Sequence, residues 1–215
     1  MIPDWAAERF KMVDKQLRRR LIRDPRVLDA MGAIPREEFI PTEHRVLAYG
    51  DDPVPIGYGQ TISQPYMTAL MAEELELTGA ESVLEVGGGC GYAAAVLGAL
   101  ARTVVSMEIV PVLVEMARDN LHRTGRDGNV TILEGDGSRG YLPLAPYDAI
   151  SVAAGAPQIP ASLLNQLADP GVLVIPVGEL EDQQLRVVRK RDGRIETRMS
   201  TYCRFVPLLG GEGWT

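Results

Sequence analysis

The chain has 215 residues, of which 46% are hydrophobic and 24% charged, and its formal net charge is −7 at pH 7. These values are typical of one globular domain with a sizeable core, and the acidic balance argues against general affinity for nucleic acids or anionic membranes. Two cysteines and two histidines support neither a disulfide framework nor a metal site. We therefore expect a soluble cytoplasmic monomer without a metal or a membrane span.

The first 64 residues are expected to form helical and irregular structure. Apolar residues recur at helical spacing from Phe10 to Leu21 and predict one amphipathic helix, whose arginines we interpret as a solvated face. A second short helix is expected around 27–31. Frequent prolines and glycines over 35–64 predict irregular structure, with one short helix near 44–49.

From residue 65 onward, helical patterns alternate with short apolar runs. The predicted strands are 82–86, 103–107, 130–133, 148–152 and 172–175. The predicted helices are 65–75, 93–101, 112–121 and 160–167. This alternation indicates a parallel sheet covered by helices on both faces. Two further strand-like runs, 185–189 and 201–206, have no helix between them and predict an antiparallel pair at the sheet edge.

The first strand leads into a glycine-rich turn, Leu84-Glu85-Val86-Gly87-Gly88-Gly89-Cys90-Gly91-Tyr92. Four glycines in five positions are costly in chain entropy unless the backbone has to approach a ligand closely. In open α/β sheets, ligands bind beyond the carboxyl ends of the strands. We therefore predict that this turn holds a cofactor and is more than a tight connection.

Two cofactors compete for the turn. The spacing Gly89-x-Gly91-x-x-Ala94, followed by Glu108, matches a dinucleotide pattern. Acidic residues after the first three strands fit S-adenosylmethionine better. Glu85 would face its ammonium group, Glu108 its ribose hydroxyls and Asp136 its adenine amino group. Asp136 lies in a Gly-Asp-Gly sequence, so a simple turn residue is the alternative there.

Two other enzyme classes are disfavoured. Asp136-Gly137-Ser138-Arg139-Gly140 departs from the nucleophile elbow of hydrolases at its first position, and both histidines precede Ser138. An amino-directed DNA methyltransferase needs an Asn/Asp-Pro-Pro-aromatic sequence after the fourth strand. Ala153-Ala154-Gly155-Ala156-Pro157 stands there and offers no side-chain acceptor for an amino group.

Over nearly its whole length the chain resembles the protein-L-isoaspartate (D-aspartate) O-methyltransferases. The most specific segment is Ile56-Gly57-Tyr58-Gly59-Gln60-Thr61-Ile62-Ser63-Gln64-Pro65. The turn at 84–92 is similar to the family's adenosylmethionine loop, although Gly88 and Cys90 replace a usual Thr and Ser. Ala93 stands where Gln is common. Tyr147–Ile150, Val174–Gly178 and Phe205–Leu208 resemble later family motifs.

The resemblance implies an α/β fold of the Rossmann-like class I methyltransferase type. Its sheet would be mostly parallel and seven-stranded, with an antiparallel C-terminal edge and an N-terminal helical segment. The single domain would comprise a cap over 1–64, a cofactor-binding core over 65–178 and C-terminal strands over 179–215.

The resemblance also implies residue roles. Ser63 matches the family's active-site serine, and Tyr58, Gly59 and Gln60 are expected to contact substrate and close the site. The expected S-adenosyl-L-methionine contacts are Ile62, Ser63, Glu85, Gly87, Gly89, Gly91, Glu108, Ile109, Leu113, Asp136 and Gly137. Ser63 could instead be only the cap of the helix that begins at Pro65.

The implied reaction is methyl transfer to the free α-carboxylate of isoaspartyl residues in damaged proteins or peptides, with D-aspartyl residues as a further candidate. That carboxyl has an ordinary pKa of about 3.5 and is already ionised at neutral pH, so orientation rather than a general base would carry the chemistry. The alternatives are a related carboxyl methyltransferase with another peptide substrate, and a nucleic-acid methyltransferase using Arg18–Arg20.

Overall fold

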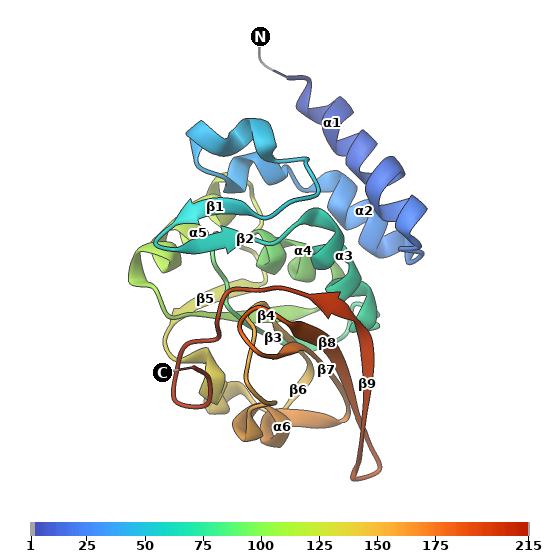
Figure 1. Ribbon diagram of the computed structural model, residues 1–215, viewed down its shortest axis with the longest axis vertical. Coiled ribbons are helices and arrows are strands. Elements are labelled where there is room, and N and C mark those ends of the chain that lie inside the picture. Colours follow the sequence, from blue (N-terminus) through green and yellow to red (C-terminus); the bar gives the residue numbers. More distant parts are fainter. Residues whose placement is uncertain (1–2, 215) are drawn as a thin grey trace.

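The computed structural model describes residues 3–214. Its centre is a seven-stranded sheet with the order β5-β4-β3-β6-β7-β8-β9 (Figure 1). The strands are β3 (Ser82–Val86), β4 (Thr103–Glu108), β5 (Val130–Glu134), β6 (Tyr147–Val152), β7 (Leu167–Gly178), β8 (Gln183–Arg191) and β9 (Arg194–Cys203). Strands β3 to β7 are parallel, and β8 and β9 pair antiparallel at the edge. This confirms the predicted fold class.

Helices cover both faces of this sheet. They are α3 (Pro65–Glu74), α4 (Tyr92–Leu100), α5 (Pro111–Arg123) and α6 (Ala161–Gln166), while α2 (Pro25–Ala33) packs on α3 and α4, and α1 (Trp5–Lys11) lies away from the sheet (Figure 1). Helices α2 to α5 share one apolar core with Val83 of β3, whereas α6 packs in a second core with Leu84 and Val86. Alternate strand side chains thus point to opposite faces, as a doubly covered sheet requires.

The predicted N-terminal apolar stripe is wrong at both ends. The side chains of Phe10 and Leu21 are 71% and 65% exposed, while the buried residues are Met12, Val13 and Leu17. The chain changes from α-helix to a π-helical turn at Met12–Leu17. A π-turn takes more residues than an α-turn, so a stripe drawn at α-helical spacing loses its phase there.

The segment 35–64 is more regular than predicted. It contains short 3₁₀ helices at Arg36–Phe39 and Thr42–Leu47, and a hairpin of β1 (Val54–Gly57) and β2 (Gln60–Ile62) that the sequence analysis missed. Strands this short carry no periodic signal. The hairpin turn places Gly57, Tyr58 and Gly59 all at positive φ, a conformation in which glycine is favoured.

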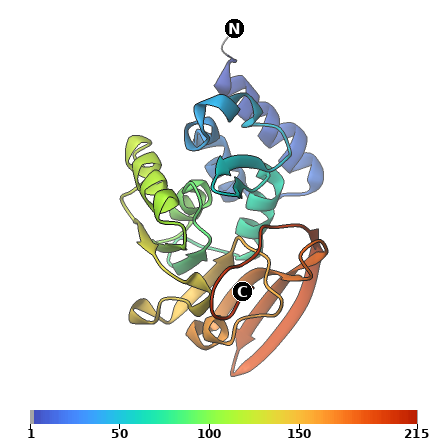
Figure 2. The same ribbon diagram turned by 60° about the vertical axis from the view of Figure 1, so that its left-hand side comes forward.

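The last strand lies earlier than the predicted 201–206. Strand β9 starts at Arg194 and ends at Cys203, and most of its side chains are exposed, so it lacks the apolar pattern of an inner strand. Residues 204–214, here called the C-terminal strap, leave the sheet and cross near its carboxyl edge (Figure 2). No helix within residues 3–214 has the length and apolar character needed to span a bilayer.

Candidate active site

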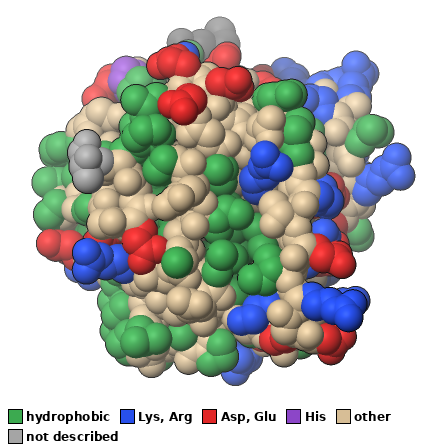
Figure 3. Space-filling model, turned by 60° about the horizontal axis from the view of Figure 1, so that its bottom comes forward, with side chains coloured by type: hydrophobic (Ala, Val, Ile, Leu, Met, Phe, Trp, Pro, Cys, Tyr) green, Lys and Arg blue, Asp and Glu red, His purple; other side chains and the backbone are tan. Residues whose placement is uncertain are grey.

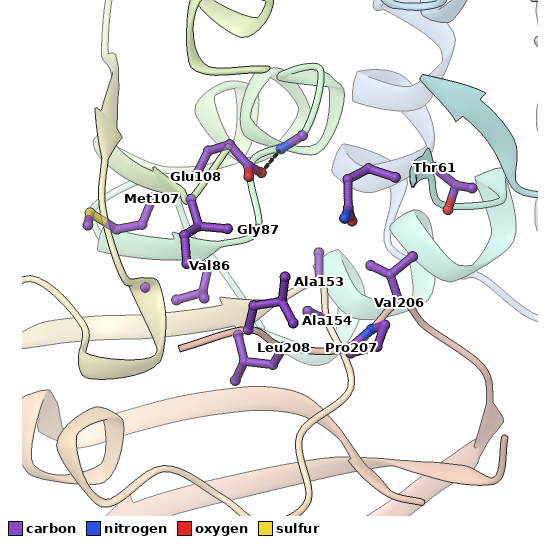
Figure 4. A pocket seen from close by; sticks show the side chains of 15 residues that line it. Thr61, Val86, Gly87, Met107, Glu108, Ala153, Ala154, Val206, Pro207 and Leu208 are labelled. Carbon is purple, nitrogen blue, oxygen red and sulfur yellow. Dashed lines mark hydrogen bonds between the residues drawn. The ribbon is translucent and has the colours of Figure 1, made fainter. Parts of the chain in front are cut away.

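A cleft of about 530 Å³ opens at the carboxyl ends of β3, β4 and β6 (Figure 4). The cleft lies where the strand order reverses, which is the usual ligand-binding position in an open α/β sheet. The cleft is lined by Gln60, Thr61, Val86, Gly87, Gly89, Met107, Glu108, Ile109, Gly137, Ala153, Ala154, Val206, Pro207, Leu208 and Leu209. The β1–β2 hairpin therefore contributes to one side and the C-terminal strap to another.

The glycine turn forms the floor of this cleft. The amides of Gly87 and Gly88 both donate to the Met107 carbonyl, at 2.9 and 3.1 Å. Gly87 and Gly89 line the cleft, whereas Gly91 starts α4 with φ +87°. A Cβ on Gly91 would lie 3.2 Å from the Ala117 backbone. Of the three glycines assigned to the cofactor, two face the cleft and the third lets α4 pack on α5.

Gly88 departs from the threonine usual in the family, and its surroundings explain why. A Cβ there would collide with the Ser106 hydroxyl. That hydroxyl donates to Glu85 Oε2 at 2.5 Å. The space that a larger residue would need is therefore filled by the Ser106–Glu85 pair.

Glu85 lies beneath the glycine turn and does not line the cleft. Its side chain is fully buried, and among the described residues its Oε1 has no hydrogen-bond partner. Desolvation by burial, with a smaller contribution from the nearby Glu108, raises its pKa to about 8. No cation of the described residues lies beside this buried carboxyl group, so it is largely protonated at pH 7, and a positive charge brought close to it would favour its ionised form.

The buried Glu85 makes the stability of the unliganded protein depend on pH. Its folded pKa of about 8 lies above the ordinary 4.5, so the folded state holds the proton longer. The contribution of Glu85 to the free energy of unfolding is complete below its ordinary pKa of 4.5 and is lost as the pH rises through about 8. We expect the free energy of unfolding to fall by about 2 kcal/mol between roughly pH 6 and 8.

Denaturant unfolding of the wild type and Glu85→Gln at the two pH values measures this effect. The glutamine variant cannot ionise at this position, so its stability should change less over the same interval. Equal pH dependence in the two proteins would show that Glu85 does not have the raised pKa.

Glu108 joins two parts of the site. Its Oε2 accepts the Gly89 amide at 2.7 Å (dashed in Figure 4), and its Oε1 accepts the Val110 amide at 2.9 Å. The side chain is 5% exposed and lines the cleft. A carboxylate has about four acceptor positions, so two remain for a ligand. Ile109, 41% exposed, adds an apolar surface next to it.

Asp136 faces the C-terminal strap. Its Oδ1 accepts the Ser138 hydroxyl at 2.6 Å, and its Oδ2 accepts the Gly211 amide at 2.8 Å. Burial acts to raise the pKa of Asp136, but the hydrogen bonds from Gly211 and Ser138 outweigh it and hold the pKa below its ordinary value. Its neighbour Gly137 does line the cleft, and a Cβ there would lie 2.6 Å from Val86 Cγ1. Leu113, on α5, is fully buried and does not line the cleft.

Ser63 lies in a second groove that joins the cleft. This groove, of about 330 Å³, is lined by Pro53, Thr61, Ser63, Gln64, Met67, Ala153, Arg204, Phe205 and Val206. It shares Thr61, Ala153 and Val206 with the cleft. Ile62 and Ser63 also line a small recess against Gly87–Gly89. The Ser63 segment and the glycine turn therefore meet.

The other predicted hairpin residues differ in placement. Gln60 lines the cleft, whereas Tyr58 is 59% exposed at the hairpin tip beside Gly59. The alternative role of Ser63 as a helix cap is wrong, because Gln64 is the N-cap of α3 and makes no side-chain cap bond.

The sequence analysis missed several residues that build the site. Thr61 and Ala153 connect the two cavities, and Val206, Pro207 and Leu208 form a wall. The resemblance identifies Phe205–Leu208 as a family motif but does not give its place in the structure. Within residues 3–214, no group of three or more His, Cys, Asp or Glu side chains is arranged to hold a metal ion.

Comparisons with known proteins agree with this geometry. Residues 7–213 match the profile of the family "Protein-L-isoaspartate(D-aspartate) O-methyltransferase (PCMT)". A protein-L-isoaspartate O-methyltransferase of Koribacter versatilis is 49% identical over 98% of this chain and 95% of its own. One from Marinobacter nauticus, named protein-L-isoaspartate O-methyltransferase 2, is 53% identical over 98% of this chain and 97% of its own.

A solved structure shares the fold as well. A Plasmodium falciparum protein assigned to the same enzyme class, in complex with S-adenosyl-L-homocysteine, superposes with a TM-score of 0.81 at 28% identity. The match covers 97% of this chain and 99% of that one. From its full-length match and its closely similar relatives, the chain belongs to the protein-L-isoaspartate (D-aspartate) O-methyltransferase family.

Proposed function

We propose that the protein transfers a methyl group from S-adenosyl-L-methionine to the free α-carboxylate of L-isoaspartyl residues in proteins and peptides. The observation that carries this proposal is the junction of the Ser63 groove with the glycine-floored cleft at Thr61 and Ala153. Such a junction lets a donor in one cavity and a peptide in the other meet at one point. Membership of the family supports the same reaction.

The residues of the cleft fit this cofactor. When bound, S-adenosylmethionine supplies an electrophilic methyl group on a cationic sulfur. Glu108 has acceptor positions left for ribose hydroxyls, and Gly87 and Gly89 present backbone to the ligand. One oxygen of the Glu85 carboxyl, Oε1, has no partner beneath the turn, and an ammonium group bound nearby would lower the raised pKa of Glu85 and favour its ionised form. Ile109, Gly137 and Ile62 would add apolar and backbone contacts, while Gly91, Leu113 and Asp136 would support the site from behind.

On the substrate side, we assign the central role to Ser63. The α-carboxyl of an isoaspartyl residue is ionised at neutral pH, so it can attack without losing a proton. The Ser63 hydroxyl would donate a hydrogen bond that orients this carboxylate in line with the methyl group. Gln60 would contact the bound molecules in the cleft, and Tyr58 and Gly59 at the exposed hairpin tip would close over them.

Paired peptides test the proposal. The protein is incubated with methyl-labelled S-adenosylmethionine and peptides that differ only in an aspartyl, isoaspartyl or D-aspartyl residue. We expect label in the isoaspartyl peptide and none in the aspartyl peptide, and the D-aspartyl arm measures the wider specificity. Absence of label from the isoaspartyl peptide would refute the proposal. Nucleic acid and peptides with other carboxyl groups serve as acceptors that test the two alternative functions. The family comparison does not favour either alternative.

A conservative change at Glu108 should weaken cofactor binding. In Glu108→Gln the amide nitrogen cannot accept, so one of the bonds from Gly89 and Val110 is lost together with a charged acceptor for the ribose. Hydrogen bonds to charged groups contribute about 1.5–3 kcal/mol, so the affinity for S-adenosylhomocysteine should fall roughly ten- to hundredfold. Titration calorimetry measures it, with Glu134→Gln as the control on β5; wild-type affinity in Glu108→Gln would remove Glu108 from the site.

We further propose that the cap (1–64), core (65–178) and C-terminal strands (179–215) act as one unit, in a cytoplasmic monomer whose partners are polypeptides. The site draws on all three parts, through Thr61, Gly87 and Val206. On the face shown in Figure 3, basic and acidic side chains both occur around hydrophobic ones, which gives little support for a nucleic-acid surface. Sedimentation of the purified protein tests the monomer.

A further inference from the structure

Arg36 is a buried cation that no carboxylate of the described residues contacts directly, and Asp51 acts on its charge only from a longer distance. It lies in the short helix after α2, and its side chain is fully inaccessible to solvent. Among residues 3–214, no carboxylate oxygen is within 4.0 Å of it, and its Nη1 has no hydrogen-bond partner. The neighbouring Glu37 is engaged by Arg9 and the Tyr49 hydroxyl. Arginines are rarely buried unless they are paired. The burial of Arg36 therefore suggests a function for its charge.

The contacts of Arg36 lead to the site. Its Nε donates to the Ala48 carbonyl at 2.7 Å, and its Nη2 donates to the Ser63 carbonyl at 2.8 Å. The guanidinium lies over the Tyr92 ring, 4.9 Å from the centroid. Tyr92 and Ser63 both line the recess where the hairpin meets the glycine turn. Arg36 therefore stands directly behind the residue to which we assign the substrate carboxylate.

The charge of Arg36 should create a positive electrostatic potential in the Ser63 groove. Burial lowers the pKa of Arg36, but a guanidinium remains protonated at neutral pH. A charge surrounded by protein is screened little by salt, and its field is stronger than that of a surface residue. A carboxylate that enters the groove would be attracted by this positive potential. A neutral ester or amide of the same carboxyl would not.

We propose that Arg36 is a positioning and specificity-determining residue: it fixes Ser63 through the backbone carbonyl, and its buried charge, which no carboxylate contacts, makes the groove prefer an anionic carboxylate over a neutral ester or amide. The inference rests on the proposed function, since it takes the Ser63 groove as the substrate site. The same preference would help a methylated product to leave, because the ester has lost the charge.

Two peptides separate this role from a merely structural one. The first contains an isoaspartyl residue, and the second is identical except that its α-carboxyl is a carboxamide. Affinities are measured on protein saturated with S-adenosylhomocysteine, for the wild type, Arg36→Met and Arg36→Lys. Arg26→Met is the matched control, because Arg26 also donates to two backbone carbonyls, of Leu77 and Leu100, but lies away from the groove.

In Arg36→Met the isoaspartyl peptide should bind roughly ten- to fiftyfold more weakly, the size expected for charges several ångströms apart at an effective dielectric of about 20. The carboxamide peptide should bind as to the wild type within about twofold, and Arg36→Lys should keep part of the preference. Equal weakening of both peptides, or unchanged affinity for both, would overturn the proposal.

A measurement on the wild type alone covers the case in which Arg36→Met does not fold. The preference for carboxylate over carboxamide should persist from low to high salt, because a buried charge is poorly screened. Loss of the preference at high salt would assign it to exposed cations such as Arg204 and overturn the proposal. Methylation of the isoaspartyl peptide by the wild type is followed in parallel, so that failure of the proposed function is seen separately.

Discussion

Ser63→Ala should lower methyl transfer to an isoaspartyl peptide about hundredfold, the cost of misplacing a reacting group by a small distance. The groove containing Ser63 joins the cleft at Thr61 and Ala153, and under the proposed function the Ser63 hydroxyl orients the carboxylate that approaches the methyl group there. Binding of S-adenosylhomocysteine should change by no more than about twofold, because the glycine turn and Glu108 are untouched.

This result can be separated from a loss of stability. The N-cap of α3 is Gln64, without a side-chain cap bond, so removing the Ser63 hydroxyl takes no cap from the helix. We expect the melting temperatures of Ser63→Ala and the wild type to agree. Ser82→Ala is the matched control, because Ser82 is the first residue of β3 and lies at the end of that strand away from the glycine turn. Full turnover in Ser63→Ala would show that another group orients the substrate.

Gly210→Ala should weaken cofactor binding roughly thirtyfold, although Gly210 does not line the cleft. Gly210 has φ +137°, and a Cβ there would collide with Asp136 Oδ1 and come within 2.7 Å of the Ser138 hydroxyl. The collision would break the bond from the Gly211 amide to Asp136 and release the strap. Since Val206–Leu209 form a wall of the cleft, the cofactor would lose that contact.

Three further variants sharpen this prediction. Gly193→Ala is the control, because Gly193 also has positive φ (+72°) but has open space around it; it should leave cofactor affinity unchanged. Asp136→Ala should weaken binding as well, and Ser138→Ala should share part of that loss if Asp136 acts through the strap. Calorimetry with S-adenosylhomocysteine measures all four, and wild-type affinity in Gly210→Ala would show that the strap does not support the site.

Much of the fold could be predicted from the sequence because its signals are local. The apolar runs at 82–86 and 148–152 and the periodic stripe of α5 each describe an element that buries one or two faces in a sheet–helix core. The hairpin at 54–62 could not be found this way, since its strands are too short to show a period and its turn depends on three successive residues at positive φ. The N-terminal stripe failed because a π-turn at Met12 shifts the helical phase.

Part of the cleft could be predicted from the sequence for the same reason. A glycine turn after a strand and an acid at the end of the next strand, Glu108, are fixed by chain order and by the shared carboxyl edge of parallel strands. The direction in which a side chain points is not fixed by chain order. Asp136 follows its strand as expected, but its oxygens are taken by Ser138 and by Gly211, which is 75 residues away in sequence.

What the amino-acid sequence determined by itself was the order of the elements, the glycine turn and the class of ligand that its acidic residues suit, because each depends on residues close together in the chain. Only the tertiary structure decided that the C-terminal strap forms a wall of the cleft, that Glu85 lies buried beneath the turn with one oxygen lacking a partner, and that Arg36 lies behind Ser63. These are contacts between distant segments. Their partners are chosen by packing geometry and by the cost of leaving buried polar groups unsatisfied, and neither quantity is written in any local pattern.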